Sequence, residues 1–157
     1  MTFAHRMTGA LAAEDTVLQQ LIEAGWKAIP FGQGTWPIDF RVAAKLCFDE
    51  YGHPSLARWL PDILACKPPL ICMFDVKDDS ESENYAIELK ALEALEASEN
   101  SFHIRSLFIF EGLFVLTPEI VRSHSRHGRP SDKGSGTPYV LINKRHAVYL
   151  DTVLEDA

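Results

Sequence analysis

Two apolar runs joined by a pair of prolines constrain the fold of this chain most strongly. Residues 63–66 precede Pro68-Pro69 and residues 70–74 follow it, a pattern typical of a strand, a tight turn and a returning strand. Asp62 and Asp75 flank the two runs, thirteen positions apart. A hairpin would therefore bring the two carboxylates side by side at its open end.

A lysine extends this acidic pair. Because side chains alternate along a strand, Lys77 should point to the same face as Asp75. Two carboxylates and an ammonium in one place suit a hard divalent cation and a phosphate group. The alternative is a pair of ordinary strand-end acids and a surface lysine. Acids are rare in strands and costly beside apolar neighbours without a partner, which favours a bound cation.

Composition places the chain among ordinary globular proteins. Its 157 residues are 46% hydrophobic and 24% charged, which predicts one domain over residues 1–157. No apolar run approaches the roughly 20 residues that span a bilayer, so we expect no membrane association. Three cysteines without paired metal spacing indicate free thiols in the cytoplasm. The net charge of −7 argues against a nucleic-acid partner without excluding a local basic face.

Hydrophobic periodicity divides the chain into alternating helices and strands. We expect helices at residues 14–24, 38–51 and 85–98, and a short helix that begins at Thr117-Pro118. We expect strands at residues 26–31, in the hairpin at 59–77, and at 107–110, 113–116, 139–142 and 147–150. Residues 1–10, 78–84 and 123–137 have the composition of a loose lead-in and polar loops. This order predicts an α/β fold.

Residues 59–64 and 74–77 together resemble the PD-(D/E)XK nuclease superfamily, and within it the small phage-type and Holliday-junction-resolvase-like nucleases. The resemblance implies a single nuclease-like domain over residues 1–157. Its restriction-endonuclease-like αβββαβ core, a mixed central sheet flanked by helices, would cover about residues 12–120, followed by a C-terminal extension at about 121–157. It implies an Mg²⁺-dependent (or Mn²⁺-dependent) endonuclease that hydrolyses phosphodiester bonds in DNA. Asp62, Asp75 and the backbone carbonyl of Val76 would be metal ligands, and Lys77 would orient the attacking water. A homodimer remains open.

Two residues outside the hairpin also fit the resemblance. Glu14 lies one turn before an apolar stripe of the first helix, where many resolvase-like members carry a glutamate that completes the metal site. The alternative is an acid favoured by the helix dipole. Glu23, at the other end of that helix, is too far from the expected site. Gln33 stands between two glycines, where it would approach DNA or a metal-bound water, or would simply belong to a turn.

Basic residues gather late in the chain. Arg122, Arg126, Arg129 and Lys133, with His124 and His127, form the one basic cluster. Their loop would follow a phosphate backbone, or it is a solvated loop. The two histidines have metal-like spacing, but no cysteine partners them, which argues against zinc. Lys90 would grip phosphate from the helix that follows the hairpin, or lie on the solvated surface.

Two other functions remain open. The first is a catalytically silent nuclease-fold protein that binds nucleic acid. The second is a phage interaction or inhibitor protein, for which the acidic net charge is natural. Residues 35–58 form a longer insert than in the smallest resolvases. This insert would serve as a dimer arm, a DNA clamp or a lid.

Overall fold

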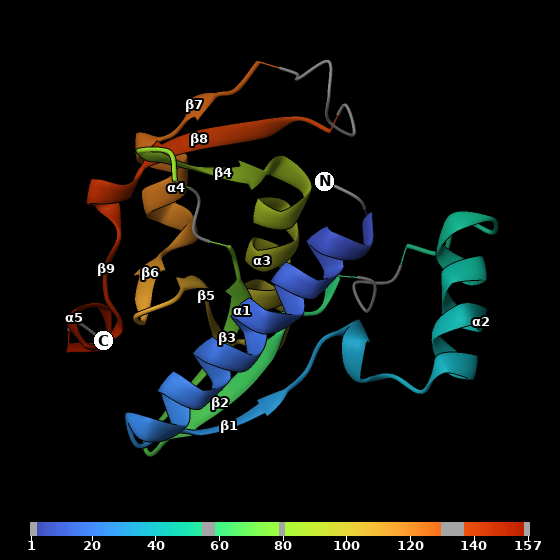
Figure 1. Ribbon diagram of the computed structural model, residues 1–157, viewed down its shortest axis with the longest axis horizontal. Coiled ribbons are helices and arrows are strands. Elements are labelled where there is room, and N and C mark those ends of the chain that lie inside the picture. The colour runs from blue at the N-terminus through green and yellow to red at the C-terminus, as the bar shows by residue number, and fades with distance from the viewer. Residues whose placement is uncertain (1–2, 55–58, 79–80, 130–136, 156–157) are drawn as a thin grey trace.

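The computed structural model of the protein describes residues 3–54, 59–78, 81–129 and 137–155 (Figure 1). At its centre is a six-stranded sheet in the order β1-β2-β3-β5-β6-β9. These strands are β1 (Lys27–Pro30), β2 (Ile63–Lys67), β3 (Leu70–Val76), β5 (Arg105–Phe110), β6 (Phe114–Leu116) and β9 (Val148–Tyr149). Only β3 and β5 pair in parallel, so the sheet is mixed. The predicted fold class is confirmed.

The predicted hairpin is present. β2 and β3 pair antiparallel from Lys67 opposite Leu70 to Ile63 opposite Phe74, and the turn between them contains the Pro68-Pro69 bond, which is cis. Asp62 and Asp75 are therefore the next positions at the open end. β3 lies inside the sheet between β2 and β5, and Asp75 near its end pairs with Phe108 of β5.

The first helix, α1 (Phe3–Glu23), covers one face of this sheet (Figure 1). Val17 and Leu21 are completely buried and pack with Trp26 and with residues of β2, β3 and β5. Gly25, at φ +94°, reverses the chain after the helix in a conformation that favours glycine. The prediction that residues 1–10 are a loose lead-in is wrong for residues 3–10, which continue the same helix.

The opposite face of the sheet packs on α3 (Leu89–Phe102) and α4 (Pro118–His124). Phe108 and Phe110 point to this side because they alternate with Leu107 and Ile109, which belong to the α1 side. A second, three-stranded sheet closes this layer. It consists of β4 (Asn84–Glu88), β8 (Tyr139–Asn143) and β7 (Arg126–His127), in the order β4-β8-β7. As predicted, Thr117 caps α4, accepting a hydrogen bond from the Ile120 N–H at 3.0 Å.

Three predicted elements differ from the structure. Residues 84–88 form strand β4, whereas residue 84 was predicted as loop and residues 85–88 as the start of a helix. They are extended because they pair with β8 in the second sheet. Arg126–His127, predicted as loop, form β7. The last predicted strand is shorter, and α5 (Leu150–Glu155) replaces its end because Leu150 and Val153 are buried in the α1-side core.

Helix α2 (Ile38–Asp49) follows the short turn η1 (Gln33–Thr35) and stands apart from the other elements (Figure 1). It ends two residues before the predicted limit. Over the residues that the structure describes, no helix is both long and apolar enough to cross a membrane. Cys47, Cys66 and Cys72 are all free thiols, as predicted.

Candidate active site

Asp62 and Asp75 meet at the open end of the hairpin. A hydrogen bond joins their carboxyl groups. Asp62 Oδ2 also accepts a hydrogen bond of 2.8 Å from the backbone N–H of Val76. Val76, predicted to contribute its carbonyl, thus fixes the orientation of Asp62 through its N–H. The predicted convergence of the two acids is present.

Lys77 completes the cluster as strand alternation requires. Its Nζ lies 3.3 Å from Asp75 Oδ2, and both side chains are mostly buried. Burial alone would lower the pKa of Lys77, but the charge of Asp75, its hydrogen bond and the charge of Asp62 outweigh that effect and raise it. Lys77 therefore carries a fixed positive charge at neutral pH.

Glu14 reaches the same cluster from α1. Its carboxyl group makes a hydrogen bond with Asp62 and lies close enough to Asp75 to be affected by its charge. Burial is the main cause that raises the pKa of Glu14, and the hydrogen bond to Asp62 opposes it. The predicted inward orientation of Glu14 is present. The alternative of an acid favoured by the helix dipole is wrong, because α1 begins at Phe3 and Glu14 lies in the middle of the helix. Glu23, at the far end of α1, is exposed.

Three carboxyl groups so close together resist full ionisation. Burial raises the pKa of Asp62 to about 9, helped by the charge of Asp75, the hydrogen bond between them and the charge of Glu14. The Val76 N–H acts in the opposite direction. Without a cation, Asp62 is therefore protonated at neutral pH. The proton shared by these carboxyl groups partly neutralises their charge, as a bound hard cation would do in its place.

Two cavities meet at Asp62. One, of about 280 Å³, contains the Asp62, Asp75 and Lys77 side chains and is walled by η1, by residues before β2 and by α3. The other, of about 240 Å³, contains Glu14 and Asp62. The η1 turn is held against the site by the Phe31 N–H, which donates to the Asp62 carbonyl at 2.8 Å.

Gly32 lies against Asp62 at a spacing that would still admit a Cβ atom in ordinary van der Waals contact. A Cβ atom at residue 32 would lie 3.4 Å from Asp62 Cα and 3.5 Å from Asp62 Oδ1. Gln33, which follows it, lines the larger cavity, as its predicted role near substrate requires.

The donor set suits a divalent cation. Asp62, Asp75 and Glu14 offer only carboxylate oxygens, the ligands that Mg²⁺ and Mn²⁺ prefer. Within the described ranges, no group of three or more His, Cys, Asp or Glu side chains is already arranged to hold a metal ion. The carboxyl groups of Asp62, Asp75 and Glu14 hydrogen-bond to one another, so binding of a cation would release the proton that they share.

The other predicted contacts lie outside this cluster. Lys90, in the first turn of α3, is exposed and does not line either cavity. Arg122 forms a forked pair with Glu96 of α3, with Nη2 2.6 Å from Oε1. Arg126 and Arg129 are exposed, and Lys133 lies outside the described residues. His124 stacks on His146, with ring centroids 4.4 Å apart.

Among the lining residues of the larger cavity that were not predicted from the sequence are a carboxylate and a large aromatic side chain. Glu88, the last residue of β4, lines it and contributes to the raised pKa of Lys77. Trp59 lines it from the segment before Pro61. Alternation along residues 84–88 is the signal for Glu88: Tyr85 and Ile87 are buried, so Glu88 belongs to the opposite face of the strand.

No protein-family model and no curated protein matches the sequence. Among solved structures, the chain is similar to Hjc, a Holliday junction resolvase from the archaeal hyperthermophile Archaeoglobus fulgidus. The TM-score is 0.56 at 13% sequence identity, and the match covers 93% of this chain and 95% of that chain. At this identity the likeness concerns the fold alone. The chain therefore shares the fold of this resolvase, and it carries three carboxyl groups and a lysine together at the open end of the hairpin.

Proposed function

We propose that the protein is a metal-dependent endonuclease that hydrolyses phosphodiester bonds in DNA. The observation that carries this proposal is the convergence of Asp62, Asp75 and Lys77 at one end of the hairpin, with Glu14 joined to Asp62 from α1. The fold adds support, because it is similar to that of a Holliday junction resolvase. A fold alone hosts many functions, so the side chains carry the argument.

Asp62, Asp75 and Glu14 would hold Mg²⁺ or Mn²⁺, with the Val76 carbonyl as a further ligand. When bound, the ion supplies Lewis-acid polarisation of the scissile phosphate and lowers the pKa of a coordinated water. The protein contributes the geometry: the hairpin register aligns Asp75 with Asp62, and the Val76 N–H holds the Asp62 carboxyl in place.

Lys77 would act on the phosphate and the attacking water. Because its pKa is raised, it acts as a hydrogen-bond donor and a fixed charge rather than as a general base. Asp75 restrains its Nζ at 3.3 Å, so little reorganisation is needed as negative charge develops on the phosphoryl oxygens.

Cleavage of a DNA panel tests this function directly. Linear duplex, supercoiled plasmid, single-stranded and four-way-junction DNA would each be incubated with Mg²⁺, Mn²⁺ or EDTA. We expect cleavage only with a divalent ion, and calorimetric binding of Mn²⁺ to the protein alone. If the protein binds Mn²⁺ to no measurable extent and cuts none of the substrates, it is a nuclease-fold binding module.

Glu14→Gln should weaken Mn²⁺ binding by about 10- to 100-fold without unfolding the protein. Glutamine preserves a hydrogen bond to Asp62 but removes a carboxylate charge from the donor set. Calorimetric titration with Mn²⁺ measures the effect. Glu23→Gln is the matched control, because Glu23 is exposed at the other end of the same helix. Equal Mn²⁺ affinity in the two variants would remove Glu14 from the set of metal ligands.

Arg126→Ala should lower DNA affinity uniformly across sequences. It should also reduce the slope of log affinity against log salt concentration by about one. The Arg126 side chain is exposed in β7 and available to phosphate. Arg122→Ala should have a smaller effect, because Glu96 already neutralises that guanidinium. Fluorescence anisotropy at several salt concentrations compares the variants. A larger loss in Arg122→Ala would mean that the Arg122–Glu96 pair opens to bind DNA.

A further inference from the structure

Helix α2 presents an unusual amount of apolar surface. None of its twelve residues is buried. Ile38, Phe40, Val42 and Leu46 are between 46% and 64% exposed, and Tyr51, just after the helix, is 83% exposed. A helix of this length is marginal in water unless an apolar face is packed. The sequence of α2 is therefore that of a packed helix, yet no part of the chain that the structure describes covers it.

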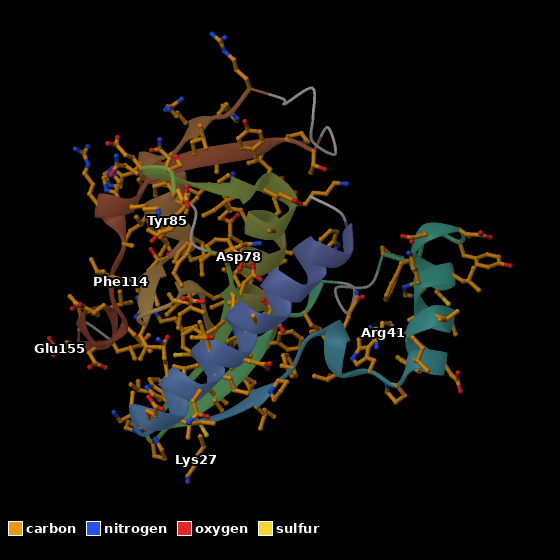
Figure 2. All side chains as sticks on the ribbon, viewed as in Figure 1. Lys27, Arg41, Asp78, Tyr85, Phe114 and Glu155 are labelled. Atoms are coloured by element: carbon orange, nitrogen blue, oxygen red, sulfur yellow. The ribbon has the colours of Figure 1, made fainter. Side chains whose placement is uncertain are left out.

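The burial pattern shows which side of α2 contacts the rest of the chain. Arg41, Ala44 and Phe48 are half-buried, and their spacing places them on one face. Arg41 Nη2 donates to the Trp36 carbonyl at 3.5 Å, and Figure 2 shows Arg41 on the side of α2 toward the body of the molecule. The other sides of the helix carry the apolar residues Ile38, Phe40, Val42, Ala43, Leu46 and Cys47, which we call the α2 apolar face; the acids Asp39 and Asp49 lie among them.

The size of the α2 apolar face fits self-association. With Tyr51 it exposes on the order of 600 Å² of apolar side chain, at the upper end for the largest such patch on a monomer. Two copies of this face packed together would bury roughly 1,200 Å², the lower bound for a specific stable interface. DNA is a poor occupant, because Lys45 is the only basic residue of α2 outside the side that faces the body, and phosphate binding depends on cations.

The position of α2 in the chain connects this face to the candidate active site. Gln33 and Gly34, which precede α2, line the 280 Å³ cavity. Trp59, Leu60 and Pro61, which follow the insert, line the same cavity from another side. Any partner that fixes α2 therefore acts on both segments that wall the cavity around Asp62, Asp75 and Lys77.

We propose that α2 is a dimerisation arm: two copies of the chain pack their α2 apolar faces against each other, and the dimer fixes the walls of the active-site cavity. Of the three roles open to this insert, the apolar surface selects the dimer arm. The coupling to the cavity rests on the proposed nuclease function, whereas dimerisation through α2 does not.

Sedimentation equilibrium over a wide range of micromolar concentrations tests the dimer. The double variant Val42→Gln/Leu46→Gln places polar groups in the centre of the face and should weaken dimerisation by at least about 100-fold, because four apolar side chains per dimer are lost. Lys45→Gln, on the same helix beside Leu46, is the matched control and should remain dimeric. Circular dichroism confirms that each variant is folded.

Cys47 reports which surface covers α2. It is exposed in the single chain, whereas Cys66 is half-buried and Cys72 is buried. Maleimide labelling of Cys47 should slow as protein concentration rises, and should become fast at all concentrations in the double variant. A wild-type protein that remains monomeric, or a double variant that dimerises normally, would overturn the proposal. Protection of Cys47 that is independent of concentration would also overturn it, because α2 would then fold onto its own chain.

Cleavage assays separate this inference from the proposed function. The coupling is supported if the wild type dimerises and cleaves DNA while the double variant is monomeric and does not cleave. If the double variant is monomeric but cuts DNA at the wild-type rate per chain, the coupling to the cavity is wrong. If wild-type protein dimerises through α2 but never cuts DNA, the nuclease function fails while the dimer arm stands.

Discussion

Lys77→Ala is expected to reduce the rate of DNA cleavage by about 100- to 1,000-fold, the usual effect of removing one preorganised donor to a developing negative charge. Lys77 is well placed for this role, because Asp75 holds its Nζ at 3.3 Å and its raised pKa keeps it charged. Alanine removes the ammonium but none of the carboxylates. Mn²⁺ affinity should therefore change far less than the cleavage rate, and the fold should be retained.

Single-turnover cleavage and Mn²⁺ calorimetry on the same preparations measure the two effects. Lys90→Ala is the matched control, since Lys90 is exposed on α3 and lines neither cavity. Lys77→Arg keeps the charge but changes its shape, so it should restore only part of the rate. A loss of Mn²⁺ affinity as large as the loss of rate would mean that Lys77 serves mainly to position Asp75.

The hairpin shows why part of the site was predictable from the sequence. Its turn, its register and the side that each residue faces depend on local features: two prolines, two apolar runs and strand alternation. Asp62, Asp75 and Lys77 lie within that local unit, so their convergence follows from the chain itself. Glu14 was harder, because its contact with Asp62 depends on how α1 packs across the sheet.

β4 shows where local reasoning failed. Residues 85–88 adjoin a run of Ala, Leu, Glu and Lys with strong helix propensity, which favoured a single long helix. In the structure Tyr85 and Ile87 are buried while Ala86 and Glu88 are exposed, and β8, more than fifty residues later, supplies the pairing. Tertiary pairing overrode propensity, and Glu88 was missed in the cavity wall as a consequence.

Helix α2 shows a different limit. Its existence followed from periodicity, but apolar residues surround most of the helix, so the pattern did not show which face packs on the body. The structure settles that the face with Arg41, Ala44 and Phe48 is turned inward. The three roles left open by the sequence are distinguished only once the exposed surface is known.

Asp62→Asn is expected to make the metal-free protein more stable at neutral and alkaline pH while removing its response to Mn²⁺. The pKa of Asp62 is raised to about 9 by burial and by Asp75, against about 3.9 in an unfolded chain. Between these values the native state retains a proton that the unfolded state has released. The free energy of unfolding of the wild type therefore falls as pH rises from about 4 to 9, by up to about 1.4 kcal/mol per pH unit.

Asparagine removes this pH dependence with little change in shape. Its side-chain oxygen still accepts from the Val76 N–H, and its amide can donate to Asp75 without a titrating proton. Thermal unfolding in EDTA at several pH values should show a melting temperature that falls with pH in the wild type, by about 2–4 °C per kcal/mol lost. The fall should be much shallower in Asp62→Asn, where only Glu14, whose pKa is also raised, still contributes.

Added Mn²⁺ provides the decisive comparison, because the ion replaces the proton that the native state otherwise requires. Wild-type protein should regain stability with Mn²⁺, increasingly so at higher pH, and Asp62→Asn should not respond. Asp151→Asn, an exposed acid in the first turn of α5, controls for the general loss of a negative charge. If Asp62→Asn lowers the melting temperature in EDTA at pH 8, Asp62 is ionised in the native protein, and the proton shared with Asp75 does not account for how these buried carboxyl groups coexist.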